Sequence, residues 1–351
     1  MSQRIVDALL ERARLDPRVS VVEPLKPGPY VRLSHGGLLT VGDNAALVSR
    51  DNGETWGRGR KMYSGPGPGV PGGGGVMART REGVLVYVYQ DMKTFKWSWS
   101  KAKKEARESV CNVWAIRSTN EGKSWSGRRQ LLEGYCGALI DMIATSTGEI
   151  VVPVQLMLED PSRHAIRVHV SDDGGKSWYR SNIIDLGGHG HHDGAMEPTL
   201  VELKDGRLWM LMRTNLDEFW EAFSADKGRS WRVIQPSGID ASTAPGYMLR
   251  LHSGRLALVW NRLYPKGKKS YRRRPGDCQY HAVDAVWHRE ELSLSFSRDE
   301  GASWSEPTVI IRIKGGDPCY PYVFERDPGY LWVTTRFGEK WSLSLRESDF
   351  V

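Results

Sequence analysis

The sequence predicts an all-β fold: a six-bladed β-propeller of four-stranded antiparallel blades, preceded by a short N-terminal helix. Two observations predict the propeller. A turn motif with the pattern Ser-x-Asp-x-Gly-x-Ser/Thr-Trp recurs along the chain, and six stretches have the alternating apolar pattern of β-hairpins. Recurrence of one motif along a chain indicates a repeated supersecondary unit.

The turn motif occurs five times. The copies are Ser49–Trp56, Ser118–Trp125, Ser171–Trp178, Ser224–Trp231 and Ser297–Trp304, and the second carries Asn120 in place of Asp. The Asp or Asn side chain accepts hydrogen bonds from the backbone that follows it, Gly supplies positive φ, and Trp packs against the neighbouring strand. These properties suit a tight turn between the two outer strands of a blade.

The hairpins give the order of the blades. They are Tyr30–Val41, Val76–Gln90, Gly137–Gln155, Glu197–Arg213, Tyr247–Asn261 and Tyr320–Arg336. No turn motif follows the sixth, so we expect a strand near Val19–Val22 to complete the last blade and close the ring. A blade cannot bury both of its faces alone, so the six units should form one domain over residues 18–351.

Three segments interrupt this pattern. A Gly/Pro loop, Gly65–Gly75, leads into the second blade. Two insertions, Asp91–Arg107 and Leu263–Trp287, delay the turn motifs of blades two and five. Both insertions are long enough to be functional loops rather than simple connections.

The N-terminal segment, residues 1–17, has Ile5, Leu9 and Leu10 at helical spacing, which predicts a short amphipathic helix that caps the ring. It lacks the apolar core of a signal peptide, and no run in the chain reaches transmembrane length. We therefore expect a soluble cytoplasmic protein with no membrane partner. The four cysteines show neither metal-ligand spacing nor a paired pattern, which indicates no metal and no oxidising compartment. They are Cys111, Cys136, Cys278 and Cys319.

The formal net charge is +7, but the basic residues are scattered and only Lys266–Arg274 forms a dense cluster. We interpret that cluster as a solvated loop. Without a stripe of basic and aromatic residues the charge does not indicate nucleic-acid binding, although it is compatible with an anionic substrate. No motif indicates a cofactor, and the sequence leaves the oligomeric state open.

The propeller fold predicts where a site should lie. The first strand of each blade lines the central channel and the second runs back, so the start of the first and the end of the second meet at one face. Polar residues occupy these positions in most blades, and converging polar groups indicate a binding site. The residues placed there are Tyr30, Asp43, Asp91, Cys136, Gln155, His191, His192, Asp193, Glu197, Arg213, Tyr247, Asn261, Arg262, Arg289, Tyr320 and Arg336.

Five such turns on six hairpins resemble the sialidase superfamily, also called BNR-repeat or Asp-box proteins, over about residues 18–351. Four positions carry the resemblance further. Glu197-x-x-x-Val-Glu-Leu-x-Asp-Gly followed by Met-Arg213 is similar to the family's blade-four motif. Arg289-x-x-Leu before the last turn motif resembles the third arginine, and Tyr320-Pro resembles the nucleophile.

The resemblance implies an exo-α-sialidase-like glycoside hydrolase that releases a terminal, acidic sugar from a glycan or glycoconjugate by a retaining mechanism. In that role Tyr320 would attack the sugar and Glu197 would accept its proton, because a Tyr nucleophile avoids repulsion by the substrate carboxylate. Arg213 and Arg289 would bind that carboxylate by bidentate hydrogen bonds. We expect Gln155, Asn261, Arg262 and Arg336 among the further substrate contacts.

The sequence departs from the family at blade one. Family members have an Arg-Ile-Pro motif there, whereas this chain has Lys26-Pro-Gly-Pro-Tyr30. Arg32 falls inside the strand, so Lys26 and Arg336 are the candidates to replace the missing arginine. The proton donor is either Asp43, by its position after the first hairpin, or Asp91, by its position in the insertion of blade two.

The run His189-Gly-His191-His192-Asp193 offers an alternative chemistry. His titrates near neutral pH, so His191 or His192 could act as acid or base, or bind sugar together with Asp193. A metal would need further ligands that the run lacks. Two alternatives therefore stand beside the first hypothesis: a propeller glycosidase or lyase for another glycan that uses this loop, and a carbohydrate-binding propeller without catalysis.

Overall fold

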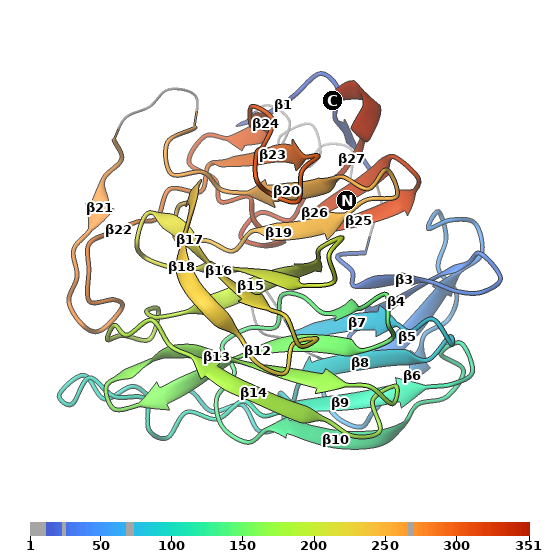
Figure 1. The fold of residues 1–351 in the computed structure, drawn as a ribbon, viewed down its shortest axis with the longest axis horizontal. Helices are drawn as coiled ribbons and strands as arrows, with labels where there is room; N and C mark the ends of the chain where they lie inside the picture. Colours follow the sequence, from blue (N-terminus) through green and yellow to red (C-terminus); the bar gives the residue numbers. More distant parts are fainter. Residues whose placement is uncertain (1–11, 23–25, 68–73, 266–269) are drawn as a thin grey trace.

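The described part of the chain, residues 12–22, 26–67, 74–265 and 270–351, forms six antiparallel sheets around a common centre in this computed structural model (Figure 1). Each sheet is one predicted blade. The innermost strands of neighbouring blades contact one another, including β3 with β7, β7 with β11, β15 with β19 and β19 with β25. The all-β propeller prediction is confirmed.

The strands follow the predicted order. Blades one to three comprise β3 (Tyr30–Arg32), β4 (Leu38–Gly42), β5 (Ala45–Ser49) and β6 (Arg60–Lys61); β7 (Gly75–Arg79), β8 (Leu85–Gln90), β9 (Val113–Ser118) and β10 (Ser126–Leu132); and β11 (Ile143–Ala144), β12 (Ile150–Glu159), β13 (Ser162–Ser171) and β14 (Tyr179–Ile184). Blades four to six comprise β15 (Met196–Glu202), β16 (Leu208–Arg213), β17 (Glu218–Ser224) and β18 (Arg232–Asp240); β19 (Tyr247–Arg250), β20 (Leu256–Trp260), β23 (Glu291–Ser297) and β24 (Thr308–Ile313); and β25 (Cys319–Asp327), β26 (Tyr330–Phe337) and β27 (Ser342–Arg346). A short pair, β21 (Arg273–Arg274) and β22 (Ala285–Val286), lies in the insertion of blade five, and the 3-10 turn η2 (Glu347–Asp349) ends the chain.

The N-terminal segment closes the ring as predicted. Strand β2 (Ser20–Val21) pairs with β27 and becomes the outer strand of blade six. The predicted helix over residues 1–17 lies mostly outside the described residues. Within its described end, β1 (Ala13–Leu15) is a strand rather than a helix, because it pairs with the open edge of β24 in blade five.

Blade three begins later than predicted. Its first strand is only Ile143–Ala144, whereas the predicted hairpin starts at Gly137. The carboxylate of Asp141 accepts bonds from the N–H of Met142 (2.8 Å) and of Leu200 (3.0 Å), so a side chain takes the place of strand pairing there.

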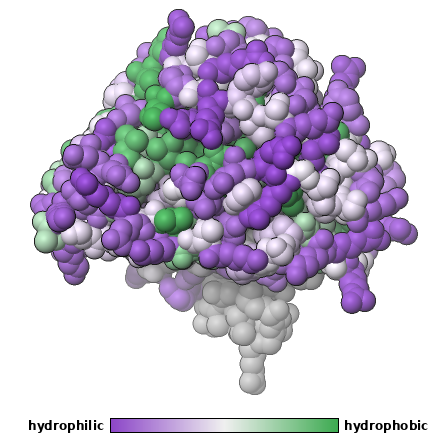
Figure 2. All heavy atoms as spheres, turned by 90° about the horizontal axis from the view of Figure 1, so that it is seen from below, coloured by the Kyte–Doolittle hydropathy of each residue, from purple (hydrophilic) through white to green (hydrophobic). Residues whose placement is uncertain are grey.

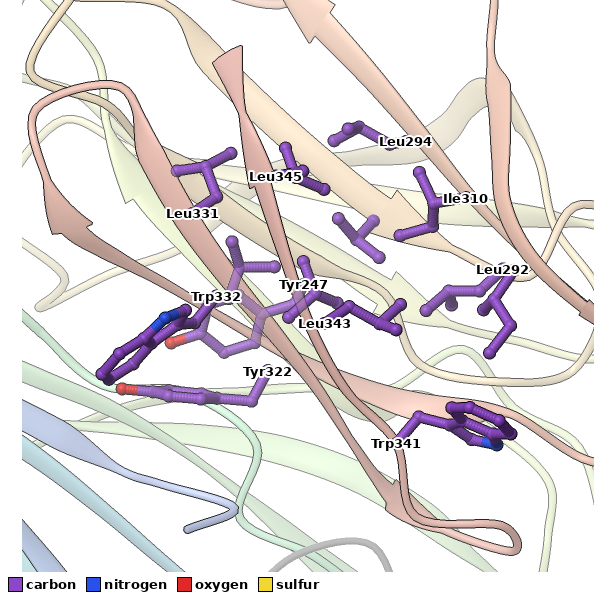
Figure 3. Packing of buried hydrophobic residues seen from close by; sticks show 14 of the residues in the cluster. Tyr247, Leu292, Leu294, Ile310, Tyr322, Leu331, Trp332, Trp341, Leu343 and Leu345 are labelled. Carbon is purple, nitrogen blue, oxygen red and sulfur yellow. The ribbon is translucent and has the colours of Figure 1, made fainter. Parts of the chain in front are cut away.

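Apolar side chains are buried between the blades. The face drawn in Figure 2 is mostly hydrophilic, with apolar residues gathered in one part of it. Figure 3 shows Leu292 and Leu294 of blade five beside Leu343 and Leu345 of blade six, and all four are buried. Burial of one such side chain contributes roughly 1.5–3 kcal/mol, so the blade interfaces hold the ring together. Among the described helices, none combines the length and the apolar character that crossing a membrane requires.

The turn motifs connect the third and fourth strands of their blades, as predicted. In the fourth blade, Ser224 ends β17 and its hydroxyl donates to Asp226 (2.8 Å), while the N–H of Ser230 donates to the same carboxylate oxygen (2.8 Å). Gly228 has a φ of 88°, and a Cβ there would lie 3.1 Å from side chains of blade three. The motif thus both closes the turn and seats one blade against the next.

We predict that Asp173→Asn keeps the third turn motif but removes its pH dependence. Burial raises the pKa of Asp173, but hydrogen bonds from Ser177 and Ser171 outweigh burial and lower that pKa to about 2. A lowered pKa stabilises the fold above the ordinary value of 3.8, and this contribution is lost as pH falls towards 2. Asn120 shows that an amide suits the turn, since its Nδ2 donates to Ser124 (2.8 Å).

The free energy of unfolding should therefore fall by about 1 kcal/mol in Asp173→Asn at pH 7, and the gap from the wild-type protein should close near pH 2. Urea unfolding of both proteins at pH 7 and near pH 2 measures this difference in the free energy of unfolding. A gap that is equal at the two pH values would contradict this account.

Candidate active site

Three predicted residues meet at the ends of strands of blades four and six. Tyr320 lies at the start of β25, Glu197 at the start of β15, and Arg213 ends β16. The tyrosine hydroxyl donates to Oε1 of Glu197 at 2.6 Å. Arg213 Nη1 donates to Oε2 of Glu197 at 2.6 Å and to the tyrosine oxygen at 3.1 Å. Blades four and six therefore contribute to one buried, hydrogen-bonded group of Glu197, Arg213 and Tyr320, which we call the tyrosine group.

The backbone at this group is strained. Glu197 and Tyr320 have φ values of 45° and 56°, a region that side-chain-bearing residues rarely adopt. Each precedes a proline, and the pairing of β15 with β16 shifts register between Met196 and Thr199, as at a β-bulge. A bulge redirects a side chain from its regular place in a strand, and strained residues cluster at functional sites.

Burial and charge set the protonation of this group. Burial and the neighbouring Glu197 carboxylate raise the pKa of the Tyr320 phenol well above its usual value. Burial alone would lower the pKa of Arg213, but the Glu197 charge more than offsets it, so that pKa is raised. The phenol is thus neutral unless Glu197 accepts its proton, and Arg213 remains a cation.

A second arginine lies beside the first. Arg289 Nη2 donates to the carbonyl of Thr243 (2.6 Å), and the Thr243 hydroxyl accepts a bond from Arg213 Nε (3.0 Å). Arg213 Nη2 and Arg289 Nε are buried N–H donors without a partner among the described residues. Trp287 covers both guanidinium groups, at 5.6 Å and 5.1 Å from its ring. Two donors are therefore available for an anionic group.

The histidine run forms a loop next to these arginines. Asp193 is a structural brace, because its carboxylate accepts four N–H bonds, from His189, Gly194, Asn215 and Ala282. The backbone N–H of His192 donates to the carbonyl of Tyr280 (2.8 Å). Burial, with His191 and Arg213 nearby, lowers the pKa of His192 to about 2.

His191 is also neutral at ordinary pH. Burial lowers its pKa to about 4. Its carbonyl lies 3.2 Å from Nε2 of His164, a buried histidine that the sequence did not single out and whose pKa burial lowers to about 4. The loop therefore presents neutral imidazoles to the site rather than cations.

Among the described residues, the two candidate proton donors form no hydrogen bond or ion pair with Tyr320, Glu197 or Arg213. Asp91 is buried and forms an ion pair with Arg128 (2.7 Å). Asp43 is exposed in the turn between β4 and β5, with a φ of 52°. Both carboxylates contribute to raising the pKa of Tyr63, after burial, so both face the same tyrosine. Neither has a hydrogen bond to Tyr320 within the described parts of the chain.

The remaining predicted contacts have mostly structural partners. Gln155 accepts the N–H of Glu197 (2.8 Å) and so fixes the strained backbone. Asn261 donates to the carbonyl of Glu291 (2.8 Å), and Arg262 pairs with Asp240 (3.2 Å).

Arg336, the candidate for the missing arginine, lies 4.2 Å over the ring of Tyr322 and donates to Pro27 (3.2 Å). Its Nη2 is buried and has no partner among the described residues. The other candidate, Lys26, contributes its carbonyl to the Tyr30 hydroxyl. Of these two candidates, only Arg336 therefore has a buried side-chain N–H donor without a partner among the described residues.

Two residues that contact the arginines of this site, Thr243 and Trp287, could not be placed there from the sequence. Thr243 has no motif, and Trp287 was recognised only as the end of an insertion. Over the described ranges, the His, Cys, Asp and Glu side chains form no group of three that could hold a metal ion.

Comparisons with known proteins agree with this architecture. The family model described as a BNR repeat-like domain matches residues 42–333. A solved protein of unknown function from Dyadobacter fermentans is similar at a TM-score of 0.60 and 17% identity, over 95% of this chain and 98% of that one. The NanB sialidase of Streptococcus pneumoniae is similar at a TM-score of 0.61 and 12% identity, over 100% of this chain and 73% of that one.

The Trypanosoma rangeli sialidase, solved with 2,3-difluorosialic acid as a covalent intermediate, is similar at a TM-score of 0.56 and 16% identity, over 95% of this chain and 59% of that one. At these identities the likeness concerns the fold alone. No curated protein matches the sequence. The match to the family model spans most of the chain, and on that ground the chain belongs to the BNR repeat-like domain family.

Proposed function

We propose that this protein is a retaining glycoside hydrolase, similar to exo-α-sialidases, that releases a terminal acidic sugar from a glycan. The observation that carries the proposal is the buried group in which the hydroxyl of Tyr320 donates to Glu197 and both accept from Arg213. A phenol with a raised pKa attacks only when a base takes its proton, and the carboxylate stands at 2.6 Å.

The first step follows from this geometry. The oxygen of Tyr320 bonds to the anomeric carbon while its proton passes to Glu197, and the glycosidic C–O bond breaks. The leaving oxygen takes a proton from Asp43 or Asp91. In the second step water attacks the anomeric carbon and gives its proton to that aspartate, while the bond from this carbon to the Tyr320 oxygen breaks and that oxygen takes its proton back from Glu197. Two displacements retain the configuration of the sugar.

The substrate carboxylate would bind to the open donors of the arginines. Arg213 Nη2 and Arg289 Nε are buried and unpartnered, and a buried donor without a partner costs free energy that an anion would recover. The neutral state of His192, with a pKa of about 2, leaves the arginines as the cations next to Tyr320. This supports an acidic rather than a neutral sugar.

A trapping experiment tests the proposal. The protein is incubated with a panel of aryl glycosides and, separately, with 2,3-difluorosialic acid, whose fluorine substituents slow hydrolysis of a glycosyl-enzyme. We expect cleavage of the sialoside, and an adduct of one sugar on the peptide that contains Tyr320. Glycan binding without turnover or adduct would instead identify a carbohydrate-binding propeller.

We predict that only one of Asp43→Asn and Asp91→Asn behaves as loss of the general acid. That variant should cleave a glycoside with a sugar leaving group at least about a hundredfold more slowly, but should retain most activity on an aryl glycoside whose phenol leaves without protonation. Rates on the two substrates give the answer. Equal losses on both substrates in both variants would exclude each aspartate as the acid.

We predict that His192→Gln leaves the pH dependence of kcat/KM unchanged. A histidine with a pKa of about 2 is neutral at every pH where the protein is assayed. Replacing it therefore removes no ionisation from the pH profile of kcat/KM. KM should rise a few-fold through the loss of a polar contact. A limb of the pH profile that disappears in the variant would instead favour a glycosidase or lyase that uses the histidine loop.

A further inference from the structure

A second pocket adjoins the proposed carboxylate site. It lies in the insertion of blade five, has a volume of about 480 Å³, and is lined by Arg272, Arg273, Arg274, Trp287 and His288, among others. The strands β21 and β22 that carry it project beside β17 and β18 in Figure 1. We call it the outer arginine pocket.

The three arginines do not play the same part. Arg273 forms an ion pair with Asp217 of blade four and donates to the carbonyl of Asp284 (3.0 Å), which ties the insertion to the ring. Side chains of successive residues in a strand point to opposite sides. Arg274, the next residue of β21, therefore projects to the other side from Arg273, and Arg272, which precedes the strand, is exposed and lines the same pocket.

These two arginines have no acidic partner in the part of the chain that the structure describes. Within the described residues, neither Arg272 nor Arg274 forms an ion pair. The guanidinium of Arg274 lies 4.5 Å over the ring of Trp287. The same ring lies 5.1 Å from Arg289 and 5.6 Å from Arg213, so one indole joins the pocket to the proposed carboxylate site. Like charges gathered around one ring repel one another, and an anion among them relieves this repulsion.

We propose that the outer arginine pocket binds a second anionic group of the same substrate, carried by the sugar next to the one that is released. This rests on the proposed function, which places the terminal sugar at Tyr320 and leaves the rest of the glycan to lie beyond Trp287. The group is an oxyanion, such as a carboxylate or sulfate, because guanidinium groups bind such anions by paired hydrogen bonds. The substrate class is then a glycan with neighbouring acidic sugars.

The test compares two disaccharides with the same terminal sialic acid, one linked to a second sialic acid and one to a neutral galactose. In Arg272→Ala/Arg274→Ala, KM for the acidic disaccharide should rise about tenfold while kcat stays unchanged. KM for the neutral disaccharide should not change. The control is Arg58→Ala/Arg298→Ala, which removes two exposed charges elsewhere and should alter neither KM.

Equal rises in KM for both disaccharides, or the same rise in the control, would overturn the proposal. A separate measurement keeps it distinct from the proposed function. Binding of thio-linked, uncleavable forms of both disaccharides to Tyr320→Phe is followed by calorimetry, with and without the two arginine substitutions. Selective binding of the acidic form through the arginines, without turnover in the wild-type protein, would support anion binding in the outer arginine pocket but contradict the proposed hydrolase activity. Equal affinity for both forms would defeat the pocket.

Discussion

Replacement of Tyr320 by Phe should lower kcat at least about a thousandfold, because it removes the oxygen that we propose as the nucleophile. The ring packs as before, and Glu197 keeps its bond from Arg213 at 2.6 Å. The loss of the two hydrogen bonds of the hydroxyl, to Glu197 and from Arg213, should lower the free energy of unfolding by only about 1–3 kcal/mol. Initial rates on the sialoside and urea unfolding of the same preparation separate chemistry from folding.

Tyr322→Phe is the matched control. Tyr322 lies two residues along the same strand, is also buried, and its hydroxyl accepts the backbone N–H of Tyr30 at 2.9 Å rather than a bond in the tyrosine group. This variant should lose a similar amount of stability and keep its kcat. Full activity in Tyr320→Phe would defeat the mechanism, and equal losses in the two variants would trace the effect to the fold.

The propeller could be predicted because the turn motif and the hairpin pattern recur along the chain, so the prediction does not depend on any single residue. The turn motif fixes the third and fourth strands, and strand alternation fixes the first two, so the meeting of Glu197, Arg213 and Tyr320 follows from strand ends alone. Their roles stay predictions. The strand Ala13–Leu15 was missed because its partner, the edge of β24, lies far along the chain and leaves no local signal.

The other features of the site that the sequence did not predict lie in loops. The sugar contact expected of Asp193 stays a prediction, and nothing in the sequence indicated that its carboxylate accepts four N–H bonds from three segments, which depends on how loops pack. Thr243, which joins the two arginines, carries no pattern at all. Periodicity places residues in strands, whereas the direction of a loop side chain is decided by tertiary contacts.

Arg213→Met should be the most destabilising substitution at the site. The side chain of Arg213 is 1% exposed and that of Glu197 is 8% exposed, so removal of the cation leaves a buried carboxylate without its counter-ion. Breaking such a pair from one side costs about 3–5 kcal/mol of unfolding free energy. Urea unfolding measures the loss. Activity should be lost as well, since the tyrosine oxygen and the proposed substrate carboxylate both lose a donor.

The double variant Glu197→Gln/Arg213→Met separates the ion pair from packing. If the unpaired charge causes the loss, neutralising Glu197 should restore roughly half or more of the stability, and the two effects should be strongly non-additive. Activity should stay absent, because a glutamine cannot accept the proton of Tyr320. Additive losses would mean that Arg213 acts through volume alone. Non-additive stability with no recovery of turnover is the result that the proposed mechanism requires, because the same carboxylate then both pairs with Arg213 and serves as the base.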